Sequence, residues 1–335
     1  MAEDARPESV WILTDGKAGD EMQCLGVVEA LGLAPEYRRV APRAPFVWTM
    51  PWFGIDPAEA PDRPGSPIRP PFPDLVVASG RRAVTYLKRV KEASGGRTFT
   101  VFLKDPRVGA GAADFIWVPA HDRLRGPNVL ATPTSPHRFS PTRLAAARAA
   151  PRPEIAALPR PRIAVMLGGD SRRVRYTDID FDAFAGMVSV PFGEDETASF
   201  MVTESRRTPP AFAAALRAAL DGWPHFWWDG AGDNPYAEML ALADGLVVSG
   251  DSVNMVDEAL ATGAPVRVYL PDGADARVRH RLEGLAEAGL IDLWWRGGPT
   301  RHLENRVTET IDSTPTIAAA ILERYAAFRQ HPGPR

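Results

Sequence analysis

Short apolar runs alternate with amphipathic stretches along this chain, and the alternation forms two separate series. Apolar runs bounded by glycine or proline are typical of buried strands, whereas apolar positions that recur every three to four residues predict helices. In the first series, the run at 10–14 leads into a glycine-containing loop, and the run at 74–79 is followed directly by a glycine. This series predicts strands at 10–14, 36–40, 74–79, 98–103, 114–118 and 129–131, and helices at 21–31 and 81–93.

The second series follows a proline-rich bridge at 149–162. Strands that alternate with helices favour a parallel sheet covered on both faces, so each series predicts one doubly wound α/β domain. The predicted strands of this series lie at 163–167, 199–203, 225–228, 245–249 and 265–269, and its helices at 180–190, 209–220, 235–243 and 252–261.

The two series and the terminal segment define the predicted domain organisation. Thr314 and Pro315 are typical of an N-cap and the first position of a helix, and Ile317, Ile321 and Tyr325 then fall on one helical face. We expect this last helix to pack back on the first domain. The predicted parts are a first domain at 1–150 with a proline-rich excursion at 41–73, a second domain at 160–313, and the terminal helix at 314–330.

Composition narrows the classes of function. The 335 residues are 45% hydrophobic and 24% charged, which is typical of a globular protein large enough for two domains. The 39 lysines and arginines against 42 acidic residues give a net charge of -3. Because nucleic-acid binding relies on a basic surface, this balance argues against a nucleic-acid-binding protein. The single cysteine, Cys24, excludes an internal disulfide framework and a cysteine-rich zinc site, and its helical pattern predicts a place in the core.

Targeting and metal signals are absent from the sequence as well. No apolar run reaches the length of a membrane span, and residues 1–10 lack the apolar region of a secretory signal, so we expect a cytoplasmic protein. The six histidines form no HxxxH or HExxH spacing, and no Asp-x-Asp pair follows a predicted strand. We therefore expect neither a metal nor another cofactor.

One charged loop follows the first predicted strand. Residues 14–23 combine two glycines with Asp15, Lys17 and Asp20, but they do not match a Walker phosphate loop. Glycine lets backbone approach a ligand closely, so the functional interpretation has Lys17 or a neighbouring carboxylate facing a substrate. The structural alternative is a tight turn with a solvated charge cluster.

Two further loops follow strands of the second series. Gly168, Gly169 and Ser171 end the strand at 163–167, where backbone N–H groups can bind a phosphate. Arg206 and Arg207 follow the strand at 199–203, and two guanidinium groups suit multidentate phosphate recognition. A plain strand-ending turn and two solvated arginines are the alternatives.

The stretch 249–265 is the most informative part of the chain. Asp251 or Ser252 caps a helix, Asn254 lies in its first turn, and the carboxylate of Glu258 could accept both hydroxyls of a ribose. On chemistry alone, the preferred interpretation of Glu258 is a surface residue of a helix that packs through its apolar positions.

Four aromatic residues lie within a proline-bounded segment of the excursion. Aromatic side chains of this kind suit a membrane interface or an apolar acceptor groove, and the alternative is a loop folded back over the first domain's core. The four are Phe46, Trp48, Trp52 and Phe53.

The stretch 249–266 resembles the donor helix of nucleotide-sugar transferases of the GT-B fold. Its Glu258-Ala259 pair, followed by Gly263 and Pro265, is similar to that of the lipid II-forming N-acetylglucosaminyltransferase of peptidoglycan synthesis. In that class the matching glutamate binds the donor ribose, so the resemblance favours the functional interpretation of Glu258.

The whole chain more closely resembles the mitochondrial-fission Elm family, which includes bacterial proteins and a plant organelle-fission factor. The resemblance implies a GT-B-like architecture of two Rossmann-like domains facing a central cleft. Within the matching segments, Gly80, Arg81, Asp105 and His121 are candidate acceptor or cleft residues. The resemblance rests on segments 15–23, 73–82, 104–107, 119–130, 167–171, 203–209, 232–236 and 249–259.

These observations together predict a metal-independent glycosyltransferase that uses a nucleotide-diphosphate sugar and a lipid-linked or envelope acceptor. The second domain would bind the donor through the glycine loop, Arg206 and Glu258. Asp15 or Asp20 would act as the base, with Lys17 as an electrostatic helper. Two alternatives stay open: a nucleotide-sugar epimerase of the same fold, and a non-catalytic fission scaffold. If the four aromatics of the excursion do not fold back over the core, they would allow peripheral contact with the inner face of the membrane.

Overall fold

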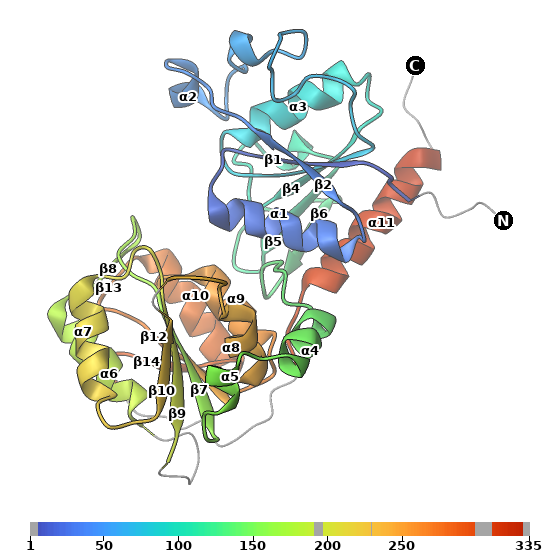
Figure 1. The fold of residues 1–335 in the computed structure, drawn as a ribbon. Coiled ribbons are helices and arrows are strands. Elements are labelled where there is room, and N and C mark those ends of the chain that lie inside the picture. Colours follow the sequence, from blue (N-terminus) through green and yellow to red (C-terminus); the bar gives the residue numbers. More distant parts are fainter. Residues whose placement is uncertain (1–5, 191–196, 229, 299–309, 331–335) are drawn as a thin grey trace. The chain divides into compact units, whose positions relative to one another are not determined.

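The chain divides by its contacts into two units. Unit 1 is discontinuous and comprises Met1–Arg138 and Asp312–Arg335, while unit 2 comprises Phe139–Ile311. Figure 1 shows the elements of each unit along the chain. The computed structural model describes residues 6–190, 197–228, 230–298 and 310–330.

Unit 1 is built on a six-stranded parallel sheet with the order β2-β1-β3-β4-β5-β6. The strands match their predicted ranges to within a residue or two. The four inner strands are buried on both faces and therefore almost continuously apolar, whereas the edge strand at 35–39 is polar and mostly exposed. They are β1 (Val10–Thr14), β2 (Pro35–Arg39), β3 (Leu75–Ser79), β4 (Phe99–Leu103), β5 (Phe115–Pro119) and β6 (Val129–Thr132).

Helices cover both faces of this sheet. Alternate residues such as Ile12 and Val77 pack beneath α1 (Ala18–Ala30) and α11 (Thr314–Gln330), which lie side by side in Figure 1. The intervening residues pack on the other face, beneath α3 (Ala83–Ala93). Cys24 is fully buried in the α1 core, as its helical pattern predicts.

The excursion between β2 and β3 carries α2 (Phe46–Thr49) and the short 3-10 helix η1 (Pro57–Glu59). Met50 and Ile68 are fully buried and anchor it on the α3 side of the sheet. Arg43 holds its fold by donating two hydrogen bonds of 2.7 Å to the buried Asp56 carboxylate. A second 3-10 helix, η2 (Ala110–Ala112), precedes β5.

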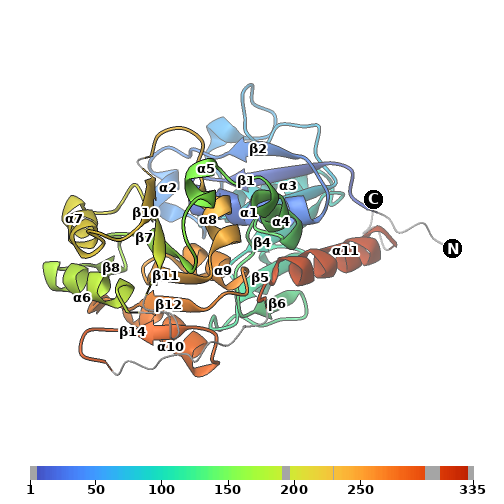
Figure 2. The ribbon, with the colours of Figure 1, turned by 60° about the horizontal axis from the view of Figure 1, so that its bottom comes forward.

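Unit 2 contains a second six-stranded parallel sheet, with the order β10-β9-β7-β11-β12-β14. Figure 2 shows this sheet, with β12 and β14 beside α10. Its strands are β7 (Arg162–Leu167), β9 (Ser199–Glu204), β10 (His225–Trp228), β11 (Gly245–Ser249), β12 (Val266–Tyr269) and β14 (Asp292–Trp294). A two-stranded antiparallel ribbon joins β8 (Val174–Arg175) to β13 (Gly273–Ala274).

The helices of unit 2 pack into a single large apolar core with both faces of the sheet. Three helices of this unit, α4, α5 and α10, and the strands β8, β13 and β14 were not expected from the sequence. The helices are α4 (Pro141–Ala149), α5 (Pro153–Ala156), α6 (Asp178–Val188), α7 (Pro210–Ala219), α8 (Tyr236–Leu242), α9 (Val253–Leu260) and α10 (Ala276–Glu287).

The unit boundary differs from the predicted domain boundary at residue 150. Helix α4 packs against α8 of unit 2, and the Arg148 guanidinium donates a 2.9 Å hydrogen bond to the carbonyl of Ala241. The segment 139–150 therefore belongs with unit 2, because its contacts are with α8 and not with the sheet of unit 1.

Candidate functional site

The strand order of unit 1 marks the place where a ligand is expected. The chain leaves β1 toward β2 on one side of the sheet, and later returns to β3 on the other side. In open α/β sheets, ligands bind beyond the carboxyl ends of the strands at such a switch point. The loops after β1 and β3 carry the predicted residues Asp15, Lys17 and Gly80.

Asp20 lies at the start of α1 and is buried at this switch point. Its Oδ1 accepts a 3.1 Å hydrogen bond from the Ser79 hydroxyl and a 2.6 Å hydrogen bond from the Lys104 ammonium. A carboxylate near a helix N-terminus is also favoured by the helix dipole. Asp20 therefore ties together the loops that follow β1, β3 and β4.

Asp15 has one engaged oxygen and one without a partner. Its side chain is 1% exposed, and Oδ2 lies 2.7 Å from the Lys17 ammonium and 3.7 Å from Nε of Arg82. Its Oδ1 is buried and has no hydrogen-bond partner among the described residues. A buried carboxylate oxygen without a donor is costly, so this atom is a candidate to accept a hydrogen bond from a ligand.

Gly80 makes room for both carboxylates. Its φ of +92° lies in a region that favours glycine, and a Cβ there would stand 3.1 Å from Oδ2 of Asp20 and 3.5 Å from Oδ1 of Asp15. The structure thus brings together three of the residues predicted for this domain, Asp15, Asp20 and Gly80, with Lys17 at the rim.

Lys104 is a site residue that the sequence analysis did not select. Its backbone adopts a φ of +85°, an uncommon conformation for a residue with a side chain, and its ammonium pairs with Asp20. Its position directly after β4 and in the segment 104–107 was the available signal.

The remaining candidates of this domain lie on neighbouring loops. Arg81 is exposed beside Gly80, Asp105 accepts a 2.7 Å hydrogen bond from the backbone N–H of Arg107, and Nε2 of His121 lies 3.9 Å from the Asp122 carboxylate. None of these contacts joins them to Asp15 or Asp20 in the part of the chain that the structure describes. Arg81, Asp105 and His121 follow β3, β4 and β5 respectively.

In unit 2 the switch point lies between β7 and β11, and Asp251 organises it. The Asp251 side chain is fully buried, and its carboxylate accepts hydrogen bonds from the Gly169 backbone N–H at 3.1 Å and the Tyr176 hydroxyl at 3.0 Å. The Ser249 hydroxyl at 2.8 Å and the Arg207 guanidinium at 2.8 Å complete its partners. Asp251 thus holds the loop after β7 against the loop after β11.

The glycine pair fits this packing. A Cβ on Gly168 would lie 2.0 Å from Oδ1 of Asp251, and one on Gly169 would lie 1.9 Å from the backbone carbonyl oxygen of Arg207. The Arg207 guanidinium also donates 3.1 Å hydrogen bonds to the carbonyls of Gly169 and Asp170. The two glycines are therefore required by contacts within the protein, and Arg207 is engaged in holding the loop.

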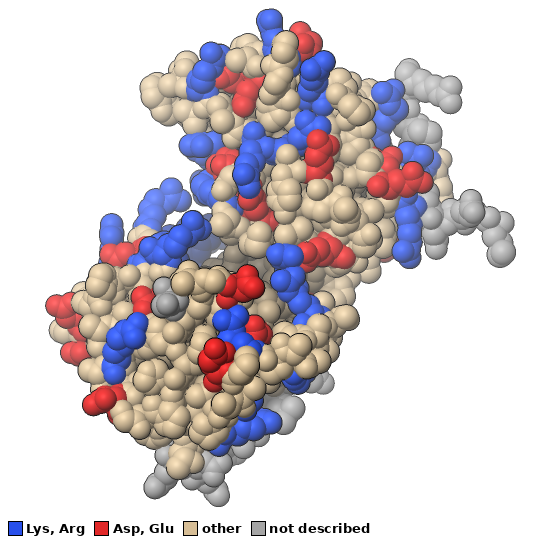
Figure 3. Space-filling view, viewed as in Figure 1, with Lys and Arg blue, Asp and Glu red and all other residues tan. Residues whose placement is uncertain are grey.

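Two further predicted residues at this end of the sheet, Arg206 and Ser171, differ in their contacts. Arg206 is exposed, and its guanidinium has no partner among the described residues. The Ser171 hydroxyl accepts 3.2 Å hydrogen bonds from the N–H groups of Arg173 and Val174, and so closes its own turn. Figure 3 shows basic side chains gathered over the β8 and β13 end of unit 2.

Helix α9 begins at this switch point. The Ser252 hydroxyl caps it by accepting a 3.4 Å hydrogen bond from the N–H of Met255. Asn254 and Glu258 are four residues apart and therefore share one face of the helix.

Glu258 is partly buried, and its Oε2 accepts a 2.7 Å hydrogen bond from the Tyr236 hydroxyl. Its Oε1 makes no hydrogen bond to the described residues. Burial raises the pKa of Glu258 to about 7, although the hydrogen bond from Tyr236 opposes the shift. The side chain therefore offers one oxygen to a ligand and changes charge near neutral pH.

Within 6–190, 197–228, 230–298 and 310–330, no group of three or more His, Cys, Asp or Glu side chains is placed to hold a metal ion. No helix in these ranges is long and apolar enough to cross a membrane. Of the four aromatics in the excursion, Phe46 is partly buried against the core, while Trp48, Trp52 and Phe53 are exposed.

The sequence matches one family model and two curated relatives. Residues 18–325 match the family model described as mitochondrial fission ELM1. The mitochondrial fission protein ELM1 of Arabidopsis thaliana is 26% identical over 244 residues, which cover 65% of this chain and 56% of that protein. The uncharacterized protein RP120 of Rickettsia prowazekii is 24% identical over 122 residues, covering 36% of this chain and 34% of that protein. The chain thus spans about half, or less, of the length of these curated relatives.

Solved structures share the fold at low sequence identity. A UDP-N-acetylglucosamine 2-epimerase from Listeria monocytogenes, so named provisionally, superposes with a TM-score of 0.52 and 12% identity, covering 97% of this chain and 98% of that one. The UDP-GlcNAc 2-epimerase of Neisseria meningitidis bound to UDP-GlcNAc gives 0.50 and 10%, covering 94% and 98%. LpCGTa in complex with UDP gives 0.50 and 14%, covering 96% and 91%. The predicted fold class, α/β and GT-B-like with doubly wound Rossmann-like units, is confirmed.

Proposed function

The chain belongs to the mitochondrial fission ELM1 family, and we propose that it is a glycosyltransferase that uses a nucleotide-diphosphate sugar as donor. The observation that carries the proposal is helix α9. Its N-terminus is capped, and Glu258 on the same short helix keeps Oε1 unengaged by the described residues. Proteins of the same fold are named for UDP-GlcNAc or were solved with UDP, which supports a nucleotide sugar as the first ligand to test.

Unit 2 binds the donor in this proposal. The backbone N–H groups at the start of α9 and the exposed Arg206 hold the diphosphate, since both favour an anion. Glu258 accepts hydrogen bonds from the ribose hydroxyls through Oε1. Asp251 and Arg207 do not contact the donor but keep the loop after β7 in place.

Unit 1 supplies the base in this proposal. An acceptor hydroxyl attacks the anomeric carbon of the sugar, a new C–O bond forms, and the bond from that carbon to the diphosphate oxygen breaks. The hydroxyl proton passes to Oδ1 of Asp15, and the bonding electron pair leaves with the diphosphate, whose charge Arg206 stabilises. Both carboxylates pair with a lysine, and Asp15 is preferred over Asp20 because its Oδ1 has no hydrogen-bond partner among the described residues.

Donor binding is tested with UDP-N-acetylglucosamine and a panel of other nucleotide sugars, by thermal shift and calorimetry. We expect one member to stabilise the protein by about 2.7 kcal/mol at 100-fold excess over its Kd. Glu258→Ala should abolish the response, and Glu287→Ala, which alters an exposed glutamate of α10, should preserve it. No response to any member, or equal responses from both variants, would overturn the donor site.

A nucleotide-sugar epimerase is the second candidate, favoured by the fold match to two proteins named as 2-epimerases. The two reactions differ in their need for an acceptor. If the bound nucleotide sugar is converted to an isomer with no acceptor present, the epimerase is correct. If the sugar is unchanged alone and is transferred when a lipid-linked or envelope saccharide is added, the transferase is correct, and Asp15→Asn should lower that rate by about 100-fold or more.

We further propose that unit 1 contacts a membrane through its exposed aromatics, consistent with a lipid-linked acceptor. Trp48, Trp52 and Phe53 are 71%, 59% and 67% exposed, and tryptophan favours the membrane interface. The double variant Trp48→Ser, Trp52→Ser should lose co-sedimentation with lipid vesicles. Trp295→Ser, which alters an exposed tryptophan of unit 2, is the matched control. Equal co-sedimentation of both variants would contradict the contact, and vesicle binding without any donor binding would favour the scaffold alternative.

A further inference from the structure

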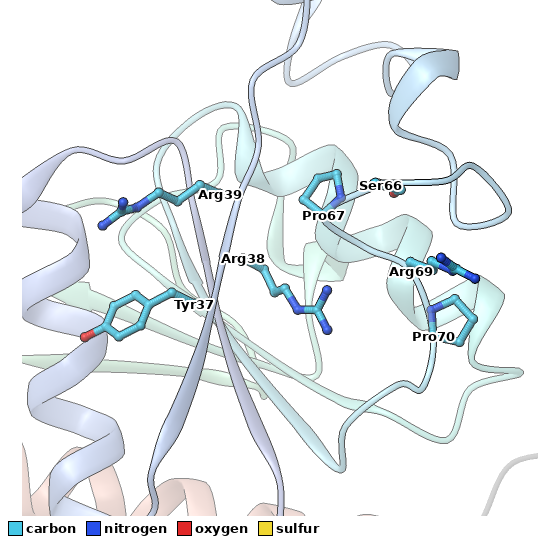
Figure 4. A pocket seen from close by; sticks show the side chains of 8 residues that line it. Tyr37, Arg38, Arg39, Ser66, Pro67, Arg69 and Pro70 are labelled. Atoms are coloured by element: carbon cyan, nitrogen blue, oxygen red, sulfur yellow. The ribbon is translucent and has the colours of Figure 1, made fainter.

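A pocket of about 550 Å³ lies beside the edge strand of unit 1. One wall is β2, which ends the sheet, and the other is the segment 65–70 of the proline-rich excursion (Figure 4). Its volume lies within the range of small-molecule sites, roughly 300–1,000 Å³. No proposed step of the transferase uses this pocket.

Three arginines, Arg38, Arg39 and Arg69, are among the residues that line this pocket. Figure 4 shows the Arg38 guanidinium pointing from β2 toward the side where Arg69 and Pro70 lie, whereas Arg39 and Tyr37 point to the opposite side of the strand. This alternation is expected for successive residues of a strand. The lining residues include no Asp or Glu, so the pocket presents positive charge.

Arg38 is held in place by an aromatic ring and a carboxylate. Its guanidinium lies 4.2 Å from the ring centroid of Trp11, which is buried, and its Nη2 is 2.8 Å from the Glu36 carboxylate. Its Nε has no hydrogen-bond partner among the described residues. A guanidinium stacked on an aromatic ring loses little freedom on binding, which favours ligand capture.

The opposite wall has a fixed backbone. The buried Ser66 hydroxyl donates a 2.7 Å hydrogen bond to the Glu59 carbonyl and accepts a 3.2 Å hydrogen bond from the N–H of Ile68. Ile68 is fully buried and anchors the segment. The next residue, Arg69, is exposed, and its guanidinium has no partner in the ranges that the structure describes.

We propose that this pocket binds the phosphate group of a phosphorylated compound, with Arg38 and Arg69 as the two guanidinium contacts from opposite walls. Guanidinium groups match the geometry of phosphate oxygens, and two from different segments allow contacts on two sides of one group. The phosphate could belong to a soluble compound or to a lipid headgroup, and the site stands independently of the proposed donor site in unit 2.

The test is calorimetric titration of the full chain with inorganic pyrophosphate. Because the proposed donor site also takes a diphosphate, the titration is repeated with Arg206→Ala, which leaves the pocket intact. Arg69→Glu should weaken binding at the pocket at least tenfold in both backgrounds. The matched control is Arg97→Glu, the same charge change at an exposed arginine outside the pocket, and it should change the affinity less than twofold.

Each outcome decides the proposal. Loss of affinity in Arg69→Glu but not in Arg97→Glu, seen in the wild-type background and again in the Arg206→Ala background, supports the pocket. Equal weakening by both charge reversals, or no saturable binding in the Arg206→Ala background, overturns it. Sedimentation with phosphatidic acid and phosphatidylcholine vesicles then distinguishes the sources: a preference for phosphatidic acid that Arg69→Glu removes indicates a lipid headgroup, and its absence indicates a soluble phosphate compound.

Discussion

Each unit holds a buried aspartate at its switch point, but the two side chains are engaged differently. In unit 1, Asp15 at the β1 and β3 switch point keeps Oδ1 without a partner. In unit 2, both oxygens of Asp251 at the β7 and β11 switch point are engaged, by four donors. Asp251 therefore acts as a structural residue, while Asp15 retains the capacity to accept a proton.

The other polar groups at the two switch points also differ between the units. Unit 2 presents the exposed Arg206 and the capped N-terminus of α9, which suit an anion. Unit 1 presents the paired acids Asp15 and Asp20, with a lysine on each. One doubly wound fold thus carries different polar groups at the switch points of its two units, because these groups come from the loops and not from the sheet.

The largest expected effect on stability comes from Asp251→Ala, and Asp15→Ala is the variant with which it is compared. Asp251→Ala leaves the Gly169 N–H and the Tyr176 hydroxyl without an acceptor in a buried site, and we expect it to lower the free energy of unfolding by about 3 kcal/mol. Asp15→Ala removes ion pairs to the more exposed Lys17 and Arg82, so its cost should be about 1 kcal/mol or less.

Urea denaturation followed by circular dichroism measures both changes. The comparison between the units fails if Asp15→Ala costs as much as Asp251→Ala. It also fails if Asp251→Ala unfolds no more readily than the wild type, since the loop after β7 would then be held by other contacts.

The pH dependence of stability should be of intermediate size and should come from unit 2. Folding raises the pKa of Glu258 from 4.5 to about 7, so the folded chain binds this proton more tightly than the unfolded chain. The contribution to stability is fully present below pH 4.5 and is lost as the pH rises toward 7. Between pH 5 and pH 8 the loss should be about 2 kcal/mol.

Glu258→Gln isolates this contribution, because glutamine can still accept the hydrogen bond from Tyr236 but does not titrate. Denaturation at pH 5 and pH 8 should therefore show a flatter dependence for Glu258→Gln than for the wild type. Glu287→Gln, at an exposed position of α10, should follow the wild type. If all three proteins lose stability in parallel, Glu258 is not the titrating group.

The sequence predicted the sheets and the position of the loops well. The strand at Val10–Thr14 matches its predicted bounds because parallel strands buried on both faces are continuous apolar runs. Helix α10 was missed because it is rich in charged residues, and its Arg281 is buried in a pair with Asp257 of α9. That pairing depends on tertiary contact and leaves no local pattern.

The sequence predicted the positions of the site residues better than it predicted their roles. The Lys104–Asp20 pair joins residues 84 positions apart, so no spacing rule identifies it. Gly168 and Gly169 were predicted to bring backbone to a phosphate, but the structure shows that contacts with Asp251 and Arg207 already require both glycines. Polar residues at a strand end indicate where a site can form. Which of their atoms have hydrogen-bond partners depends on tertiary packing.

The smallest expected effect concerns the space that unit 1 keeps around its two carboxylates. Gly80 and Gly96 both have a positive φ, +92° and +77°, so alanine at either position should cost about 1 kcal/mol through backbone strain. No atom lies within 4 Å of a Cβ placed on Gly96, whereas one on Gly80 would stand 3.1 Å from Oδ2 of Asp20. Gly80→Ala should therefore cost a further amount of about 0.5 kcal/mol and displace the Asp20 carboxylate from Lys104. Urea midpoints of the two variants measure the difference, and equal midpoints would show that Asp20 moves aside without loss, so that Gly80 serves the backbone turn alone.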